Sequence, residues 1–152
     1  MAGIIVGVDG SHDAQRALEW AMQEAAARHA TLTVLAVHQV AASGWIVAPV
    51  FLPVDEPTAE HARQTAEEAV AKAAAQLGKP QPMPVTIRTV TGFPAQELIE
   101  ASRDADLLVV GSRGHGGFAR LMLGSVSDQV MHHAHCPVVV VPRPREDERG
   151  RS

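Results

Sequence analysis

Apolar runs alternate with segments of helical periodicity along the chain. Five short aliphatic runs are typical of buried strands, and they cover residues 3–8, 32–40, 84–91, 107–110 and 138–141. Four segments between them space their apolar residues as helices do, and they cover residues 12–29, 58–77, 94–103 and 125–134. This alternation predicts an α/β fold, an open five-stranded parallel sheet with helices on both faces.

Local signals support the expected helix ends. Ser11 stands at the N-cap of the first helix, and Pro94 stands at the first position of the third. Gly78 and Pro80 follow the second helix and are typical of a helix end. We expect one domain over residues 1–142, a long loop over residues 41–56, and a disordered tail over residues 143–152, which has nothing to bury.

Composition narrows the class of protein. Of the 152 residues, 46% are hydrophobic and 20% are charged, which is ordinary for a globular protein. A net charge of −4 and an aromatic content of 3% argue against a nucleic-acid-binding protein, which needs basic and stacking surfaces. The chain has one cysteine, no apolar run of membrane-spanning length and no basic leader before its first apolar run. We therefore expect a soluble, cytoplasmic protein without a membrane or nucleic-acid partner.

Candidate binding residues follow the strands. Open parallel sheets bind ligands outside the carboxyl ends of their strands, where the strand order reverses. This rule selects three segments, residues 8–11, 37–39 and 111–127.

The third segment is suited to an anion. It contains Gly111, Ser112, Arg113, Gly114, His115, Gly116 and Gly117, and then Gly124, Ser125, Val126 and Ser127 at the start of a helix. Successive backbone N–H groups of such a loop can surround phosphate oxygens, and a helix N-terminus favours negative charge. A surface loop followed by a serine helix cap is the structural alternative. There is no Walker A lysine.

The spacing Gly111-x2-Gly114-x9-Gly124-Ser125 resembles the G-x2-G-x9-G-[ST] signature of ATP-binding members of the universal stress protein family. The resemblance covers nearly the whole chain, through VGVDGSHDAQRALEWA at 6–21, GFPAQELIEAS at 92–102, ADLLVVGSRGHGG at 105–117 and HCPVVVVP at 135–142. It implies a Rossmann-like fold of the adenine nucleotide alpha hydrolase type.

The resemblance also implies a set of nucleotide-binding residues. Gly111, Gly114, Gly124 and Ser125 would bind the triphosphate with help from Ser127, and Ser112, Arg113, His115, Gly116 and Val126 belong to the same segment. Asp9 would lie near the ribose and adenine, and Gly7, Val8 and Val37 would border the base. Family members often have a histidine just before the valine of the second strand end, where this chain has Ala36, and its histidine is His38.

Several of these residues have a second interpretation. Asp9 also suits a turn or capping position. Arg113 and His115 either face a phosphate or lie in solvent on the loop. His132, His133, His135 and Cys136 are close in sequence but diverge on a helix, so we interpret them as a helix end and a packed thiol rather than a metal site.

The resulting hypothesis is a binding module that holds ATP, with Mg²⁺ or Mn²⁺ on its phosphates, and that acts as a nucleotide-dependent stress-response regulator. The resemblance implies a homodimer joined through Val138–Val141, and the loop at 41–56 either closes over the nucleotide or packs as a hydrophobic satellite. A slow ATPase or nucleotidyl-transfer enzyme at the same site is one alternative, although no catalytic residues can be assembled from the sequence. An interaction protein that binds no nucleotide is another.

Overall fold

A computed structural model describes residues 3–39, 59–78, 84–112 and 124–142. The strands are β1 (Ile4–Val8), β2 (Leu32–Gln39), β3 (Val85–Gly92), β4 (Leu107–Gly111) and β5 (Val138–Val141). The helices are α1 (His12–Arg28), α2 (Ala59–Leu77), α3 (Pro94–Ala101) and α4 (Ser125–His133), and a short 3₁₀ helix, η2 (Ser102–Asp104), follows α3.

The five strands form one parallel sheet in the order β3-β2-β1-β4-β5, which confirms the predicted fold class. From β1 the chain crosses to β2 on one side, whereas β4 pairs with the other side of β1. The strand order therefore reverses between β1 and β4, and the carboxyl ends of these two strands border the expected ligand position.

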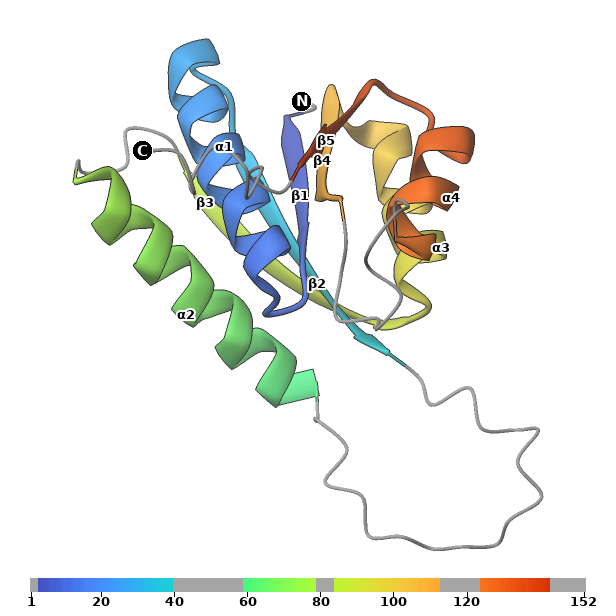
Figure 1. Cartoon of the computed structure of the whole chain (residues 1–152), viewed down its shortest axis with the longest axis horizontal. Coiled ribbons are helices and arrows are strands. Elements are labelled where there is room, and N and C mark those ends of the chain that lie inside the picture. The colour runs from blue at the N-terminus through green and yellow to red at the C-terminus, as the bar shows by residue number, and fades with distance from the viewer. Residues whose placement is uncertain (1–2, 40–58, 79–83, 113–123, 143–152) are drawn as a thin grey trace, which may run out of the picture.

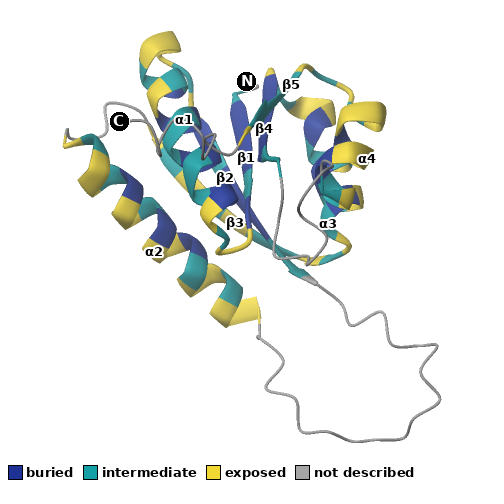
Figure 2. Ribbon diagram, viewed as in Figure 1, coloured by how far each residue is buried: buried dark blue, intermediate teal, exposed yellow. Residues whose placement is uncertain are grey.

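Helices cover both faces of the sheet. Figure 1 shows α1 and α2 on one side of the strands and α3 and α4 on the other. Alternate residues of the central strands face the two sides, so Ile4 and Val6 pack under α1 and α2, whereas Ile5 and Leu108 pack under α3 and α4. The buried residues in Figure 2 accordingly gather on the central strands and on the inner faces of the helices.

The residues that predict the helix ends lie at those ends in the structure. The Ser11 side chain accepts a hydrogen bond from the Ala14 N–H at 3.1 Å and caps α1. Phe93 is the N-cap of α3, with Pro94 in the first turn. Gly78 follows α2 with a φ of +65°, a left-handed conformation that favours glycine.

One boundary differs by more than a residue. The helix expected over residues 94–103 ends at Ala101 and continues as the 3₁₀ turn η2. The buried Ser102 hydroxyl donates to the Ile99 carbonyl at 2.6 Å and accepts from the His135 N–H at 2.9 Å. A serine hydroxyl that donates to a carbonyl of the preceding turn competes with the α-helical backbone hydrogen bonds. At Ser102 this bond accompanies the change from α-helix to the tighter 3₁₀ turn.

Candidate functional site

The site begins at the carboxyl ends of β1 and β4, which lie side by side. Val6 of β1 is in register with Val109 of β4, so the residues that follow the two strands leave the sheet together. Val8 is in register with Ala36 of β2, and Val37 comes next on that strand. The structure thus brings the first and third predicted segments together and places Val37 one strand further along the same edge.

Ser112 is the junction at this edge. Its N–H donates to the Val141 carbonyl at 3.1 Å, which ties the end of β4 to the end of β5. Its own carbonyl accepts from the Gly124 N–H at 2.7 Å and from the Ser127 hydroxyl at 2.9 Å. The main chain of one residue therefore fixes where α4 begins relative to the sheet.

The first turn of α4 offers N–H groups at this junction. Gly124 is the N-cap, with no side-chain cap hydrogen bond, and the first bond of the helix runs from the Asp128 N–H to the Gly124 carbonyl at 2.9 Å. The N–H groups of Ser125, Val126 and Ser127 belong to the turn that no helical carbonyl reaches. Such a turn, at the positive end of the helix dipole, favours an anionic acceptor.

Ser127 has a structural function in this arrangement. Its side chain is buried, and its hydroxyl is within donating distance of the carbonyls of Ser112 (2.9 Å) and Gly124 (3.1 Å). Direct help to a phosphate therefore stays a prediction for Ser127, whereas its contact with the junction is a property of the fold.

Replacing Ser127 by alanine is expected to lower the free energy of unfolding by about 1 kcal/mol. Both carbonyls keep a backbone N–H donor, so the substitution removes one intramolecular hydrogen bond and leaves no buried acceptor without a partner. Urea denaturation of the two proteins measures the difference. Ser125→Ala, at the exposed first residue of α4, is the control that should change stability less; equal losses in both variants would contradict this function of Ser127.

Asp9 lies in the turn between β1 and α1. One of its carboxylate oxygens, Oδ1, accepts from the Ser11 N–H at 2.9 Å, and the residue is exposed. The structural interpretation as a turn residue is confirmed. The contact with ribose and adenine stays a prediction, and an exposed carboxylate at this edge is available for it.

Asp13 is a residue of this edge that sequence reasoning did not identify. It lies in the first turn of α1 and is only 2% exposed. Its carboxylate forms an ion pair with Arg16, and Oδ2 lies 3.4 Å from the Ser112 hydroxyl. An aspartate in the first turn of a helix interacts favourably with the helix dipole, and this position was the only sequence feature that could have drawn attention to Asp13. Its burial depends on β4, which follows about ninety residues later in the chain.

Two glycines assigned to nucleotide binding have packing reasons as well. A Cβ at Gly111 would lie 2.7 Å from the backbone of Asp13, and a Cβ at Gly7 would lie 3.0 Å from Leu98 Cδ2. The bare backbone therefore lets the first turn of α1 approach β4 and lets α3 approach β1. Close approach of a ligand to these glycines stays a prediction.

Part of the predicted site lies outside the described residues. This part contains Arg113, Gly114, His115 and Gly116, and the whole loop at 41–56 and the tail at 143–152 also lie outside the described residues. Nothing in the structure tests the two interpretations of Arg113 and His115.

Cys136 and its histidine neighbours form a separate feature. The Cys136 side chain is half-buried, and burial, followed by the charge of Asp106, raises the pKa of its thiol. A thiol whose pKa is raised is a poor nucleophile, in keeping with a packed side chain. Within the described ranges, no group of three or more His, Cys, Asp or Glu side chains is placed to hold a metal ion.

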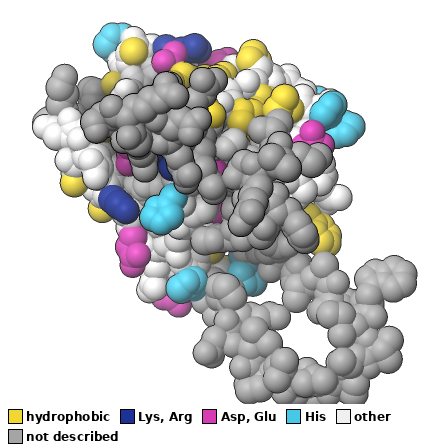
Figure 3. Space-filling view, viewed as in Figure 1, with side chains coloured by type: hydrophobic (Ala, Val, Ile, Leu, Met, Phe, Trp, Pro, Cys, Tyr) yellow, Lys and Arg dark blue, Asp and Glu magenta, His cyan; other side chains and the backbone are white. Residues whose placement is uncertain are grey.

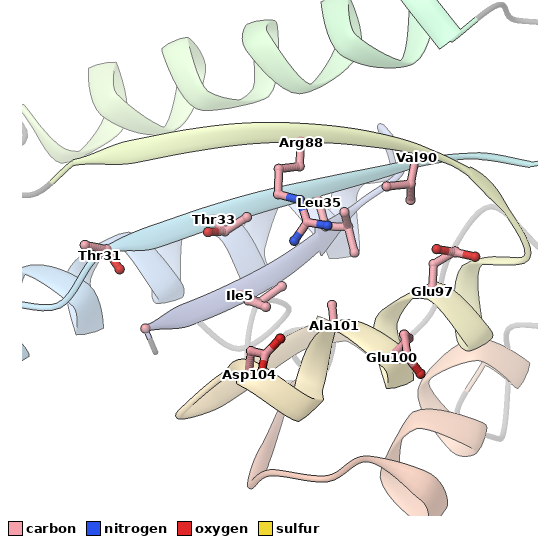
Figure 4. A pocket seen from close by; sticks show the side chains of 11 residues that line it. Ile5, Thr31, Thr33, Leu35, Arg88, Val90, Glu97, Glu100, Ala101 and Asp104 are labelled. Carbon is pink, nitrogen blue, oxygen red and sulfur yellow. The ribbon is translucent and has the colours of Figure 1, made fainter. Parts of the chain in front are cut away.

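The structure also contains a groove that the sequence did not indicate. It has a volume of about 290 Å³ and lies between α3 and strands β1, β2 and β3. Figure 4 shows Arg88 extending from β3 toward it and Glu97, Glu100 and Asp104 on the side of α3 and η2. Its lining includes Gly3 and Thr31 at the amino ends of β1 and β2, so it is separate from the ligand edge.

Surface charge and hydropathy add two observations. On the face seen in Figure 3, the described Lys and Arg side chains occur in separate places and form no continuous basic area. Among the described residues, no helix is long and apolar enough to cross a membrane.

The sequence of this chain is similar to those of known proteins. A sequence model of the universal stress protein family matches residues 2–142. A universal stress protein of Mycolicibacterium smegmatis is 37% identical over 139 residues, which are 91% of this chain and 47% of that protein. The chain thus spans about half the length of the curated relatives that it matches.

Solved structures share the fold. The universal stress protein UspA from Lactobacillus plantarum has a TM-score of 0.73 and 25% identity, covering 92% of this chain and 97% of that one. A universal stress protein crystallised in complex with cAMP has a TM-score of 0.64 and 30% identity, covering 92% and 95%. With the family match over nearly all of its length and a sheet that these structures share, this chain belongs to the universal stress protein family.

Proposed function

We propose that this protein binds an adenine nucleotide, ATP in the first place, at the carboxyl ends of β1 and β4. The observation that carries the proposal is the meeting of two helix N-termini at Ser112, where α4 begins without a side-chain cap. Both helix dipoles have their positive ends there, which favours a phosphate group. The related universal stress protein that was crystallised with cAMP supports an adenine nucleotide as the ligand.

The donor set of the described residues fits phosphate oxygens. The first-turn N–H groups of α4 and the Ser125 hydroxyl donate to the phosphates. The resemblance to ATP-binding family members assigns the glycine-rich segment from Gly111 to Gly116 to the same phosphates. Mg²⁺ or Mn²⁺ bound with the nucleotide would offset the negative charge of the phosphates. Asp9 accepts from the ribose, while Gly7, Val8 and Val37 border the adenine.

Binding without rapid turnover follows from this donor set. Backbone N–H groups neutralise phosphate charge but abstract no proton, so the site holds the nucleotide rather than hydrolysing it quickly. Nucleotide occupancy then changes a surface that a partner reads, which makes the protein a regulator of the stress response in the cytoplasm.

The edge strand β5 supports a homodimer. Its four valines are each only partly buried, and β5 pairs with β4 on one side only within the described sheet. An aliphatic edge strand exposes unpaired backbone groups that invite another strand. Pairing of β5 with its counterpart in a second copy covers both the valines and these groups.

Saturation with Mg-ATP is expected to raise the free energy of unfolding by about 2.7 kcal/mol at a concentration of 100 times the dissociation constant. For a chain of this size, the thermal midpoint then rises by roughly 5–11 °C. A thermal melt with Mg-ATP measures the shift, and Mg-GTP and adenosine are the controls for base and phosphate recognition. A midpoint that stays flat with Mg-ATP at millimolar concentration contradicts the proposed function.

A second experiment identifies the ligand that the cell supplies. The protein is purified without added nucleotide and denatured, and the supernatant is chromatographed. Stoichiometric ATP or ADP supports the binding module, whereas a product-rich mixture leaves slow hydrolysis at the same site as an alternative for a turnover assay to test.

A further inference from the structure

We infer that Asp13 is a positioning residue of the nucleotide site, acting through Ser112. It sets the first turn of α1 against the end of β4, and with it the start of α4. The inference rests on the proposed function and adds to it a residue outside the glycine-rich segment and the Asp9 turn.

The contacts of Asp13 span the junction. Its Oδ1 accepts from Arg16 within the same helix, and its Oδ2 accepts from the Ser112 hydroxyl at 3.4 Å. The backbone of Asp13 also packs so closely on Gly111 that an added Cβ there would lie 2.7 Å away. One buried residue of α1 is thereby in contact with the last residue of β4 and with the residue that follows it.

Ser112 connects the position of Asp13 to the start of α4. Its carbonyl accepts from the Gly124 N–H at 2.7 Å, and Gly124 is the N-cap of α4. A shift of the Ser112 side chain or main chain therefore moves the N–H groups of the first turn of α4. Hydrogen-bond donors bind an anion well only when they are fixed in advance, because distances and angles decide the strength of each bond.

Arg16 explains how a buried carboxylate is compatible with a polyanionic ligand nearby. Its side chain is 27% exposed, against 3% for that of Asp13, so the pair has its positive member toward solvent. Arg16 offsets the negative charge that Asp13 would otherwise present to the phosphates. The Nη2 atom of Arg16 donates to Asp13, whereas its buried Nε atom has no hydrogen-bond partner among the described residues.

The test compares the dissociation constant of Mg-ATP across matched variants by calorimetric titration. Asp13→Ala removes both contacts, Asp13→Asn keeps an oxygen that accepts from Ser112, and Ser112→Ala removes the hydroxyl. Glu24→Ala is the control, since it breaks the Glu24–Arg28 pair (2.6 Å) of the same helix at the end far from the site. The thermal midpoint of each variant without nucleotide reports stability separately.

We expect Asp13→Ala to raise the dissociation constant roughly tenfold, a common size for coupling within one hydrogen-bond network. Asp13→Asn should recover most of the affinity, and adding Ser112→Ala to Asp13→Ala should cost little more. A lowered midpoint with an unchanged dissociation constant in Asp13→Ala would show a merely structural residue and overturn the inference. If Asp13→Ala does not fold, Ser112→Ala keeps the inference testable, because it should weaken binding severalfold and Asp13→Asn should not; wild-type affinity of Ser112→Ala would overturn the inference.

The two proposals fail in different ways. If the wild-type protein and the Glu24→Ala control do not bind Mg-ATP, the proposed function is wrong and the inference falls with it. If both bind and Asp13→Ala binds equally well, the nucleotide site stands and only the positioning by Asp13 is wrong.

Discussion

Replacing Leu108 by alanine is expected to lower the free energy of unfolding by about 2–5 kcal/mol. Leu108 is 0% exposed and lies on β4, between β1 and β5. Its side chain fills the core under α3 and α4, together with Ile5, Leu98 and Val130. Truncation leaves a cavity beneath both helices, and the paired strands on either side restrict its collapse.

Urea denaturation followed by circular dichroism measures this loss. Met131→Ala is the matched control, because Met131 is 47% exposed on α4 and its truncation should cost less than about 1 kcal/mol. If Leu108→Ala cost no more than Met131→Ala, the packing of α3 and α4 on this face of the sheet would be wrong.

Gly111→Ala is expected to lower both the stability of the protein and its affinity for nucleotide. The new Cβ would lie 2.7 Å from the backbone carbon and oxygen of Asp13, atoms that no side-chain rotation can move away. Overpacking of this kind typically costs about 1–3 kcal/mol. Relief requires that the first turn of α1 separate from β4, which disturbs the Ser112 junction and the phosphate donors beside it.

Gly92→Ala provides the control for a glycine-to-alanine change at the end of a strand. There the three atoms nearest to the added Cβ belong to the flexible Glu97 side chain, whose carboxylate oxygen lies 2.6 Å away and can rotate aside. Thermal melts with and without Mg-ATP compare the two variants. A Gly111→Ala protein as stable and as responsive to ATP as Gly92→Ala would contradict the close packing of α1 on β4.

The layout of the fold could be predicted because its signals are local. Aliphatic runs such as that of β4 have too few polar positions for a half-exposed strand, and its first four residues are buried. Ser11 marks a helix start by accepting from the Ala14 N–H, and Pro94 marks one because its fixed φ suits the first turn. The end of α3 was less predictable, because the Ser102 hydroxyl bonds to the Ile99 carbonyl and also to the N–H of His135, which lies in another segment of the chain.

The interior of the site was harder to predict because its contacts join residues far apart in the sequence. The residues of the edge follow strand ends, and the glycine spacing marks the segment that resembles the family. The contacts that hold this edge together join distant residues: 99 positions separate Ser112 from Asp13, and 15 separate it from Ser127. Sequence patterns report which face a residue occupies, but not that the Ser127 hydroxyl donates to the main-chain carbonyl of Ser112.

We propose that an adenine nucleotide binds where β1, β4 and the two helix N-termini meet. Amide chemical shifts of the ¹⁵N-labelled protein, titrated with Mg-ATP, test it most directly because they report the place of binding as well as its strength. We expect the largest changes at Asp9, at Ser112 and over Gly124–Ser127. Unchanged spectra at saturating Mg-ATP, or changes concentrated around the groove at Arg88 and Glu97, would contradict nucleotide binding at this edge of the sheet.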